Sequence, residues 1–329
     1  MGILNTSKLV KAKSRDAGWC AVGIEAHGIH LAQVSLAGAM PRVVRCEFYA
    51  GEVSAAMLDK VSRGVHGGKH EVTTLLAPGE YQMLLVDAPN VPASELRTAI
   101  RWKIKDSLNY HIDDATVDVL QIPAQKYGAD RAQSLYAVAA SNVTIQKRIE
   151  LFEQAKIKLD VIDVPEMAQR NIAALFEQEG RALVVLTFDE YGGLLTFTAG
   201  GELYMSRRLE ISAGQLQDAN EGLRQQFRGR VELELQRSLD YFDRQYNHLP
   251  VSRVLVSVAE DASVLGSVGT QEGSGLVGAL TAAVDVKVEK LDLSQVMDIS
   301  LVAALADGDF AAHALPVLGA ALRQESRTL

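Results

Sequence analysis

The sequence predicts a two-lobed α/β protein in which one structural unit occurs twice and a small α+β block is inserted between the copies. The first unit consists of three short β-rich runs joined by tight turns, then a helix and a further apolar strand. The same order of elements returns about 160 residues later, and a repeat of that length indicates a duplicated domain. With 329 residues, the chain is long enough for two lobes with separate cores.

The first copy begins after a short basic segment and opens with an antiparallel meander. Its apolar runs are separated by turn residues, among them Gly28, Gly38 and Pro41. The three expected strands cover residues 20–25, 29–36 and 42–49. A helix over residues 55–63 and a strand over 72–76 complete this copy.

The second copy starts with another apolar, β-rich run and keeps the same order. Its three expected strands, separated by glycine turns, cover residues 182–188, 194–199 and 203–209. A long helix is expected over residues 231–246, because apolar residues recur there on one face. They are Val231, Leu235, Leu239, Phe242 and Tyr246. A buried strand over 253–258 closes the repeat.

The segment between the copies predicts a separate small unit with one helix and three strands. Its strand, helix, strand and strand are expected at residues 82–87, 93–108, 117–122 and 135–140. The helix is amphipathic, because apolar residues recur at four-residue spacing in Leu96, Ile100, Ile104 and Leu108. After this block, a helix, a strand and a second helix are expected at residues 143–154, 159–164 and 165–178, and Pro165 suits a first helical position.

These elements divide the chain into a tail, two lobes and an insertion. The expected parts are a disordered basic tail at 1–18, a first lobe at 19–80 plus 142–180, an inserted subdomain at 81–141 and a second lobe at 181–329. The second lobe is expected to end in a helix over 311–322, with Pro316 near its first turn.

Charge and hydropathy exclude several classes of function. The net charge of −8 argues against a global basic surface for nucleic acid. The basic tail contains Lys8, Lys11, Lys13 and Arg15 and no acid, so it could make weak contact with an anionic membrane, although a solvated terminus is the simpler interpretation. No apolar run reaches the roughly 20 residues that cross a bilayer, and no signal peptide is expected. We therefore expect a cytoplasmic protein.

The chain contains two cysteines, Cys20 and Cys46. Both lie in or beside predicted strands, and their spacing does not suit a metal site or a disulfide framework. We expect both to be small, buried hydrophobic residues and expect no metal.

Several segments, taken in order, resemble one protein family. They are residues 91–96 with 99–102, 159–171, 201–208, 235–242 and 318–323. The first carries a proline-led helix with an Ala-Ile-x-Trp core that ends at Trp102, and the last closes on the Gly-x-Ala-Leu-Arg pattern from Gly319 to Arg323. Together they resemble the PilM-type proteins of type IV pilus assembly, nearest to the MshI-like branch of the MSHA pilus. The cytoplasmic domain of the type II secretion L protein is the alternative relative.

The resemblance implies a fold and a role. The fold is the duplicated ribonuclease-H-like (actin-like ATPase) fold with an inserted α+β subdomain. The role is that of a cytoplasmic scaffold, peripheral to the inner membrane, that docks the N-terminal tail of a PilN-like inner-membrane protein and links it to the assembly motor. The implied groove lies between the first lobe and the inserted subdomain. Its candidate contact residues are Arg101, Trp102 and Lys105, although Trp102 is favoured as a core residue.

The first nucleotide-binding turn of the family departs from its pattern here. In that family, glycine turns bring backbone N–H groups close to phosphates, and an aspartate holds the water shell of the metal. The first turn is expected to be Asp-x-Gly followed by hydroxyl residues. In this chain Glu25 replaces the aspartate, His27 replaces the glycine, Gly28 follows, and the hydroxyl residues are missing.

The second and third turns depart as well. Asp189 keeps its carboxylate, but Tyr191 stands at the glycine position and Gly192 comes one residue later. The third element should be a glycine pair, and here the strand ending at Val258 continues into Ala259, Glu260 and Asp261. We therefore expect a vestigial nucleotide cleft and no enzyme activity, with Mg-ATP bound weakly if at all. The alternatives are a nucleotide-binding actin-like ATPase that gates the same assembly, with Asp189 as its acid, and a filament-forming protein.

Overall fold

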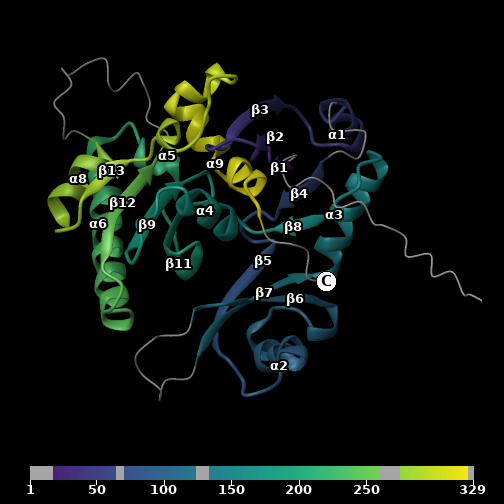
Figure 1. The fold of residues 1–329 in the computed structure, drawn as a ribbon, viewed down its shortest axis with the longest axis horizontal. Coiled ribbons are helices and arrows are strands. Elements are labelled where there is room, and N and C mark those ends of the chain that lie inside the picture. The colour runs from purple at the N-terminus through teal and green to yellow at the C-terminus, as the bar shows by residue number, and fades with distance from the viewer. Residues whose placement is uncertain (1–17, 64–69, 124–132, 259–274, 325–329) are drawn as a thin grey trace, which may run out of the picture.

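The computed structural model describes residues 18–63, 70–123, 133–258 and 275–324. These residues form two five-stranded sheets and one three-stranded sheet. Figure 1 shows the sheet of the second lobe at the left, the sheet of the first lobe at the upper right and the inserted sheet below them. The basic tail and the acidic pair Glu260 and Asp261 lie outside the described residues.

The sheet of the first lobe has the order β3-β2-β1-β4-β8. Its strands are β1 (Trp19–Glu25), β2 (Gly28–Ser35), β3 (Arg42–Ala50), β4 (Glu71–Leu75) and β8 (Val161–Asp163). The first three strands pair antiparallel as a meander, and β4 and β8 pair in parallel. Helices α1 (Ala55–Val61) and α3 (Asn142–Gln154) cover one face through Leu58 and Phe152.

The sheet of the second lobe repeats this topology in the order β11-β10-β9-β12-β13. Its strands are β9 (Ala182–Phe188), β10 (Gly193–Ala199), β11 (Glu202–Leu209), β12 (Val251–Ser257) and β13 (Val288–Lys290). Again the meander is antiparallel and the last two pairings are parallel. Helices α6 (Glu221–Gln245) and α8 (Leu276–Ala283) cover one face. The predicted duplication is therefore present in the sheets themselves.

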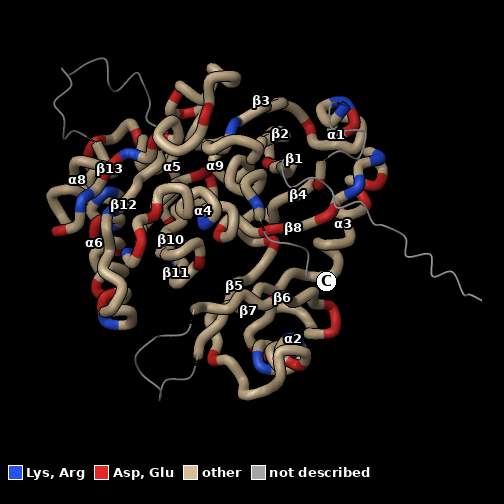
Figure 2. Tube along the Cα trace, in the orientation of Figure 1, with Lys and Arg blue, Asp and Glu red and all other residues tan. Residues whose placement is uncertain are grey.

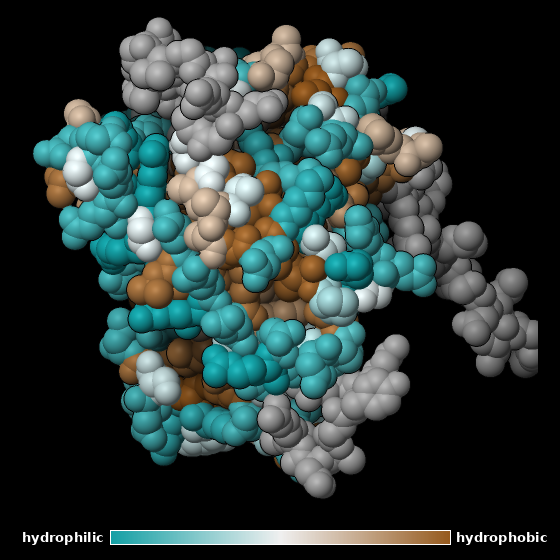
Figure 3. Space-filling view, turned by 90° about the vertical axis from the view of Figure 1, so that its left-hand side faces the viewer, coloured by the Kyte–Doolittle hydropathy of each residue, from teal (hydrophilic) through white to brown (hydrophobic). Residues whose placement is uncertain are grey.

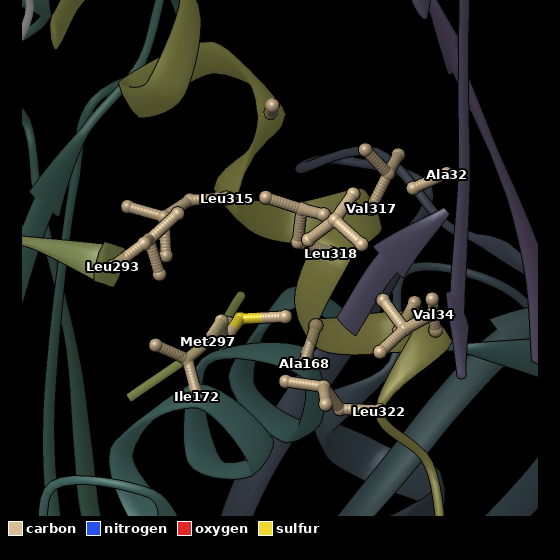
Figure 4. Close-up of a cluster of buried hydrophobic side chains, with 14 of the residues drawn as sticks. Ala32, Val34, Ala168, Ile172, Leu293, Met297, Leu315, Val317, Leu318 and Leu322 are labelled. Carbon is tan, nitrogen blue, oxygen red and sulfur yellow. The ribbon is translucent and has the colours of Figure 1, made fainter. Parts of the chain in front are cut away.

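Two helices fill the space between these sheets. Helix α4 (Pro165–Ala174) contacts β9, β10 and β11, whereas α9 (Gly308–Ala321) contacts β1, β2 and β4 of the other lobe. The two helices also pack on each other, and Figure 4 shows their side chains meeting in one apolar cluster. Beyond α9, Arg323 forms an ion pair with Asp163 of β8. The end of the described chain is thus held against the first lobe.

The inserted block forms the third sheet, in the order β5-β7-β6. Its strands are β5 (Tyr81–Asp87), β6 (Ala115–Gln121) and β7 (Ser134–Ser141), and all neighbours pair antiparallel. Helix α2 (Ala93–Ile104) covers one face through Ile100 and Ile104. On the other side, Tyr136 packs near Leu203 of the second lobe, and the Tyr136 hydroxyl accepts a hydrogen bond from the Ser206 N–H at 3.0 Å.

Several expected element bounds were wrong. Helix α6 begins at Glu221 rather than at 231. The Asn220 side chain caps this start and accepts hydrogen bonds from the Gly222 and Leu223 N–H groups. Its first turns are mostly exposed and polar, so they carry no apolar period. Pro316 lies well inside α9, not near its first turn. Among the α-helices and strands of the described residues, α5 (Ala213–Leu216), α8 and β13 escaped prediction.

None of the helices in the described ranges is long and apolar enough to span a membrane.

Candidate functional site

A cavity of about 560 Å³ opens between the two lobes. That volume is within the usual range for small-molecule sites, roughly 300–1,000 Å³. The cavity is lined by the turns after β1 and β9, by the segment after β4 and by α9. Four of the predicted cleft residues, Glu25, His27, Asp189 and Tyr191, belong to this lining. The fold therefore brings the two turns of the meanders to the same cavity.

The first turn is a two-residue hairpin with no loop for a phosphate. Glu25 pairs directly with Gly28 across the hairpin, so only Ala26 and His27 form the turn. The Glu25 carboxylate lies 2.6 Å from Nδ1 of His30 and accepts a hydrogen bond from it. A Cβ atom on Gly28 would lie 2.3 Å from the carbonyl oxygen of Tyr49. Glycine at position 28 is thus explained by strand packing alone.

The second turn is closed by its own aspartate. One carboxylate oxygen of Asp189 accepts hydrogen bonds from the N–H groups of Tyr191 at 2.8 Å and Gly192 at 2.9 Å. Those N–H groups, which would face a phosphate in a nucleotide site, already have a partner. Burial raises the pKa of Asp189, and these two N–H groups and the nearby Arg208 partly oppose the rise.

Glycine at position 192 also has a structural explanation. Its φ is +149°, and a Cβ atom there would lie 2.5 Å from the carbonyl oxygen of Leu209. Neither Gly192 nor Gly28 belongs to the described cavity lining. The two glycines are therefore needed for close approach of neighbouring strands.

The Tyr191 hydroxyl lies near carboxylates of both turns, and their charges act on its pKa. Its side chain is 47% exposed at the cavity. Burial, a hydrogen bond to Glu190 and the charges of Glu190, Glu25 and Asp189 together raise the pKa of Tyr191 to about 12. The contribution of Glu25 shows that the turns of the two lobes lie within electrostatic reach of each other.

The cavity carries an excess of acidic groups. Its described lining contains five carboxylates, from Glu25, Asp189, Glu190, Asp307 and Asp309, and no lysine or arginine. Elsewhere, Figure 2 shows basic and acidic positions interspersed along the chain. A polyanion in the cavity would meet like charge without a cation from the lining to offset it. The described lining therefore offers no lysine or arginine to the phosphates of a nucleotide.

Comparison with known proteins gives a structural match. No family model and no curated protein sequence matches this chain. Among solved structures, it is similar to a chain of the PilM-PilN type IV pilus biogenesis complex. That match has 16% identity and a TM-score of 0.70, and it covers 94% of this chain and 100% of the other. The chain has a PilM-like, actin-like fold. The predicted fold class is thereby confirmed.

Two weaker matches have TM-scores below 0.5. One is the cytoplasmic domain of EpsL, an inner membrane component of the type II secretion system of Vibrio cholerae, with 12% identity and a TM-score of 0.46 over 80% of this chain and 93% of the other. The other is a Bacteroides thetaiotaomicron protein with an actin-like ATPase fold, with 9% identity and a TM-score of 0.47 over 93% and 99%.

The three predicted partner residues of this actin-like protein lie on or just after α2, apart from the cavity. Arg101 donates hydrogen bonds to the carbonyl oxygens of Ala115 and Ile112, both at 2.7 Å, so its guanidinium holds α2 to the start of β6 within the inserted subdomain. Trp102 is 64% exposed, and its interpretation as a core residue was wrong. Lys105 is exposed in the 3₁₀ turn that follows α2. Trp102 is exposed because of the helical period: it lies two residues from both Ile100 and Ile104, which are buried, and so faces outward.

His30 was not among the residues predicted for the cleft, and the structure places it in the cavity wall. It is 3% exposed, and its ring packs near Phe48 and Phe310 with centroid separations of 4.6 and 6.0 Å. A signal existed, because His30 shares the inward face of β2 with Ala32 and Val34. Its pairing with Glu25 depends on the hairpin register and was not visible in the sequence.

Proposed function

We propose that this protein is a cytoplasmic scaffold of a type IV pilus machine that docks the N-terminal tail of a PilN-like inner-membrane protein. The observation that carries the proposal is the match to a chain of the PilM-PilN complex, which extends over 100% of that chain. The sequence motifs favour the MSHA pilus as the system served. Association with the inner membrane would come through the docked partner, with a small contribution from the basic tail.

The docking surface we propose is the exposed side of α2. Trp102 is the largest exposed apolar side chain of the described residues, and exposed tryptophans often dominate the binding energy of interfaces. Lys105 follows one turn later and adds a cation for an acidic or polar peptide. Arg101 acts indirectly, because its guanidinium is engaged with the backbone of Ile112 and Ala115.

The molecular surface offers apolar area for a partner. Figure 3 shows hydrophobic residues gathered in a central band on one face, bordered by hydrophilic residues.

The test is titration of the full chain with a synthetic peptide of the PilN-like tail from the same pilus system. The chain has two tryptophans, and Trp19 is 8% exposed, so exposed-tryptophan emission reports on Trp102. We expect a blue shift on binding and a roughly tenfold weaker Kd in Trp102→Ala. Leu301→Ala is the matched control, since Leu301 is 63% exposed and lies outside the inserted subdomain.

The outcomes separate the parts of the proposal. Unchanged affinity in Trp102→Ala would overturn the α2 surface but keep the scaffold. A peptide that fails to bind the parent chain at all would overturn the scaffold.

We also propose that the scaffold works without nucleotide. Two features support this: the Asp189 carboxylate occupies the turn N–H groups, and the cavity lining lacks lysine and arginine in its described residues. Calorimetric titration with millimolar Mg-ATP is expected to show no binding. Magnesium-dependent binding, with hydrolysis lost in Asp189→Asn, would instead support the nucleotide-gated ATPase.

A further inference from the structure

The cavity between the lobes is lined by a buried ring nitrogen, Nε2 of His30, without a hydrogen-bond partner among the described residues. Nδ1 of His30 faces the Glu25 carboxylate at 2.6 Å, and a carboxylate accepts but does not donate, so Nδ1 carries the proton. In the singly protonated ring, Nε2 is then an acceptor. It is buried and has no hydrogen-bond partner among the described residues. The side chain is 4% exposed and forms part of the cavity wall. The group that would satisfy Nε2 of the singly protonated ring is an N–H or O–H donor.

The charges of the lining restrict which donor fits. Glu25 and Glu190 come from the turns of opposite lobes, and both line the cavity. Their charges both act on the hydroxyl of Tyr191, which places the three groups near one another. The described lining has no lysine or arginine to offset these charges. A positively charged donor is favoured over a neutral or negative one.

The shape and chemistry of the wall favour an organic cation over a metal ion. The described residues contain no group of three or more His, Cys, Asp or Glu side chains arranged to hold a metal. Instead, Phe48, Tyr191 and Phe310 supply aromatic faces around the cavity. Such faces attract ammonium and guanidinium-like groups and pack against apolar bodies.

We propose that this cleft binds a small organic cation, an amidinium or ammonium group on an apolar body, with the Glu25–His30 pair and Glu190 as its recognition groups. The fold that elsewhere holds nucleotides would here be selective for the opposite charge. The inference goes beyond the docking of a partner at α2 and does not depend on it.

The experiment compares three probes of nearly equal shape and different charge: benzamidine, benzamide and benzoate. Each is titrated into the full chain and followed by ligand-observed NMR and by the shift in melting temperature. We expect benzamidine to bind at least about tenfold more tightly than benzamide, and benzoate not to bind. Benzamidine affinity should fall with added salt, and Mg-ATP should not displace it.

Variants test the named residues. Glu190→Gln removes a charge from a surface turn with little risk to folding. We expect it to weaken the binding of benzamidine about fivefold and to leave the binding of benzamide unchanged. Glu25→Gln should change the binding of the two probes in the same way. Asp118→Asn, on the exposed side of the inserted subdomain, is the matched control and should have no effect.

Equal binding of the three probes, preference for benzoate, or displacement of benzamidine by Mg-ATP would each overturn the proposal. Equal weakening by Asp118→Asn would also overturn it, because general electrostatic attraction would then explain the result. The tail peptide should bind Glu190→Gln as it binds the parent chain, so failure of this proposal and failure of the scaffold are distinguishable.

Discussion

Arg208 of β11 forms an ion pair with Glu166 of α4 across the boundary between the second lobe and the crossover helix. Its Nη2 and Nε donate to one carboxylate oxygen of Glu166 at 3.0 and 3.2 Å. The Tyr81 hydroxyl of β5 donates to the other oxygen at 2.5 Å and accepts from Arg208 at 2.7 Å. Three side chains therefore join the inserted subdomain, α4 and the second lobe. Burial, and then the charge of Glu166, raise the pKa of Tyr81 well above its usual value.

Loss of Arg208 is expected to destabilise the protein strongly. The Glu166 side chain is 3% exposed, so Arg208→Met would leave a buried carboxylate without its cation. We expect the free energy of unfolding to fall by about 3 kcal/mol, measured by urea denaturation. Arg237→Met is the control, because Arg237 pairs with Glu234 on the surface and should change stability by less than about 0.5 kcal/mol. Equal effects of the two variants would contradict this prediction.

The close approach of α4 and α9 predicts a severe effect at Gly319. A Cβ atom there would lie 2.1 Å from the carbonyl oxygen of Ala168, and backbone cannot yield as a flexible side chain can. Gly319→Ala is therefore expected to push the helices apart and lower the free energy of unfolding by about 3 kcal/mol. This displacement would also weaken the hydrogen bond from the Asn171 amide to the Gly319 carbonyl oxygen, which is 2.9 Å long in the parent structure.

Gly229 provides a control of opposite sign. It lies in α6, and an added Cβ would have no heavy atom within 4 Å. Gly229→Ala is expected to raise the free energy of unfolding by up to about 1 kcal/mol, because alanine favours the helix. A stabilising Gly319→Ala would show that α4 and α9 are less closely packed than the structure indicates.

The sequence predicted the sheets well because local patterns define them. Both meanders consist of short apolar runs between turn residues, and each strand of the two meanders lies within a residue or two of its expected place. The buried side of α2 followed from the spacing of Ile100 and Ile104. These signals depend on neighbours in the chain and therefore survive without knowledge of the tertiary structure.

The remaining features depend on contacts between distant segments. Nothing local shows that Arg208 meets Glu166, or that α9 crosses to the sheet of the first lobe. For the cleft, the sequence identified four of the residues that line it but not the bonds that decide its chemistry. Those bonds are Glu25 with His30 and Asp189 with its own turn, and each depends on the register of a hairpin.

The two thiols are expected to be unreactive in the folded protein. Cys20 and Cys46 are 0% and 3% exposed, as predicted for small core residues, and burial raises the pKa of each to about 12. Because the thiolate is the reactive form, neither should react with Ellman's reagent at pH 8 in buffer, and both should react in denaturant. Rapid labelling of one thiol under native conditions would show that its sheet opens locally.

Asp189 should make stability depend on pH in a direction opposite to that of a salt-bridged carboxylate. Because burial raises its folded pKa above the unfolded value of about 4, its ionisation disfavours the folded state. Stability from this group is complete below the unfolded pKa and is lost as the pH rises through the folded pKa.

Asp189→Asn keeps the acceptor for the Tyr191 and Gly192 N–H groups and removes the charge. We expect its Tm to exceed that of the parent by about 1–2 °C at pH 7.5, with a smaller gap at pH 4.5. Asp292→Asn, at an exposed turn where the side chain accepts from the Ser294 N–H, is the matched control. A gap that stays constant with pH, or a lower Tm of Asp189→Asn at pH 7.5, would mean that the ionised carboxylate stabilises the turn more than its burial costs.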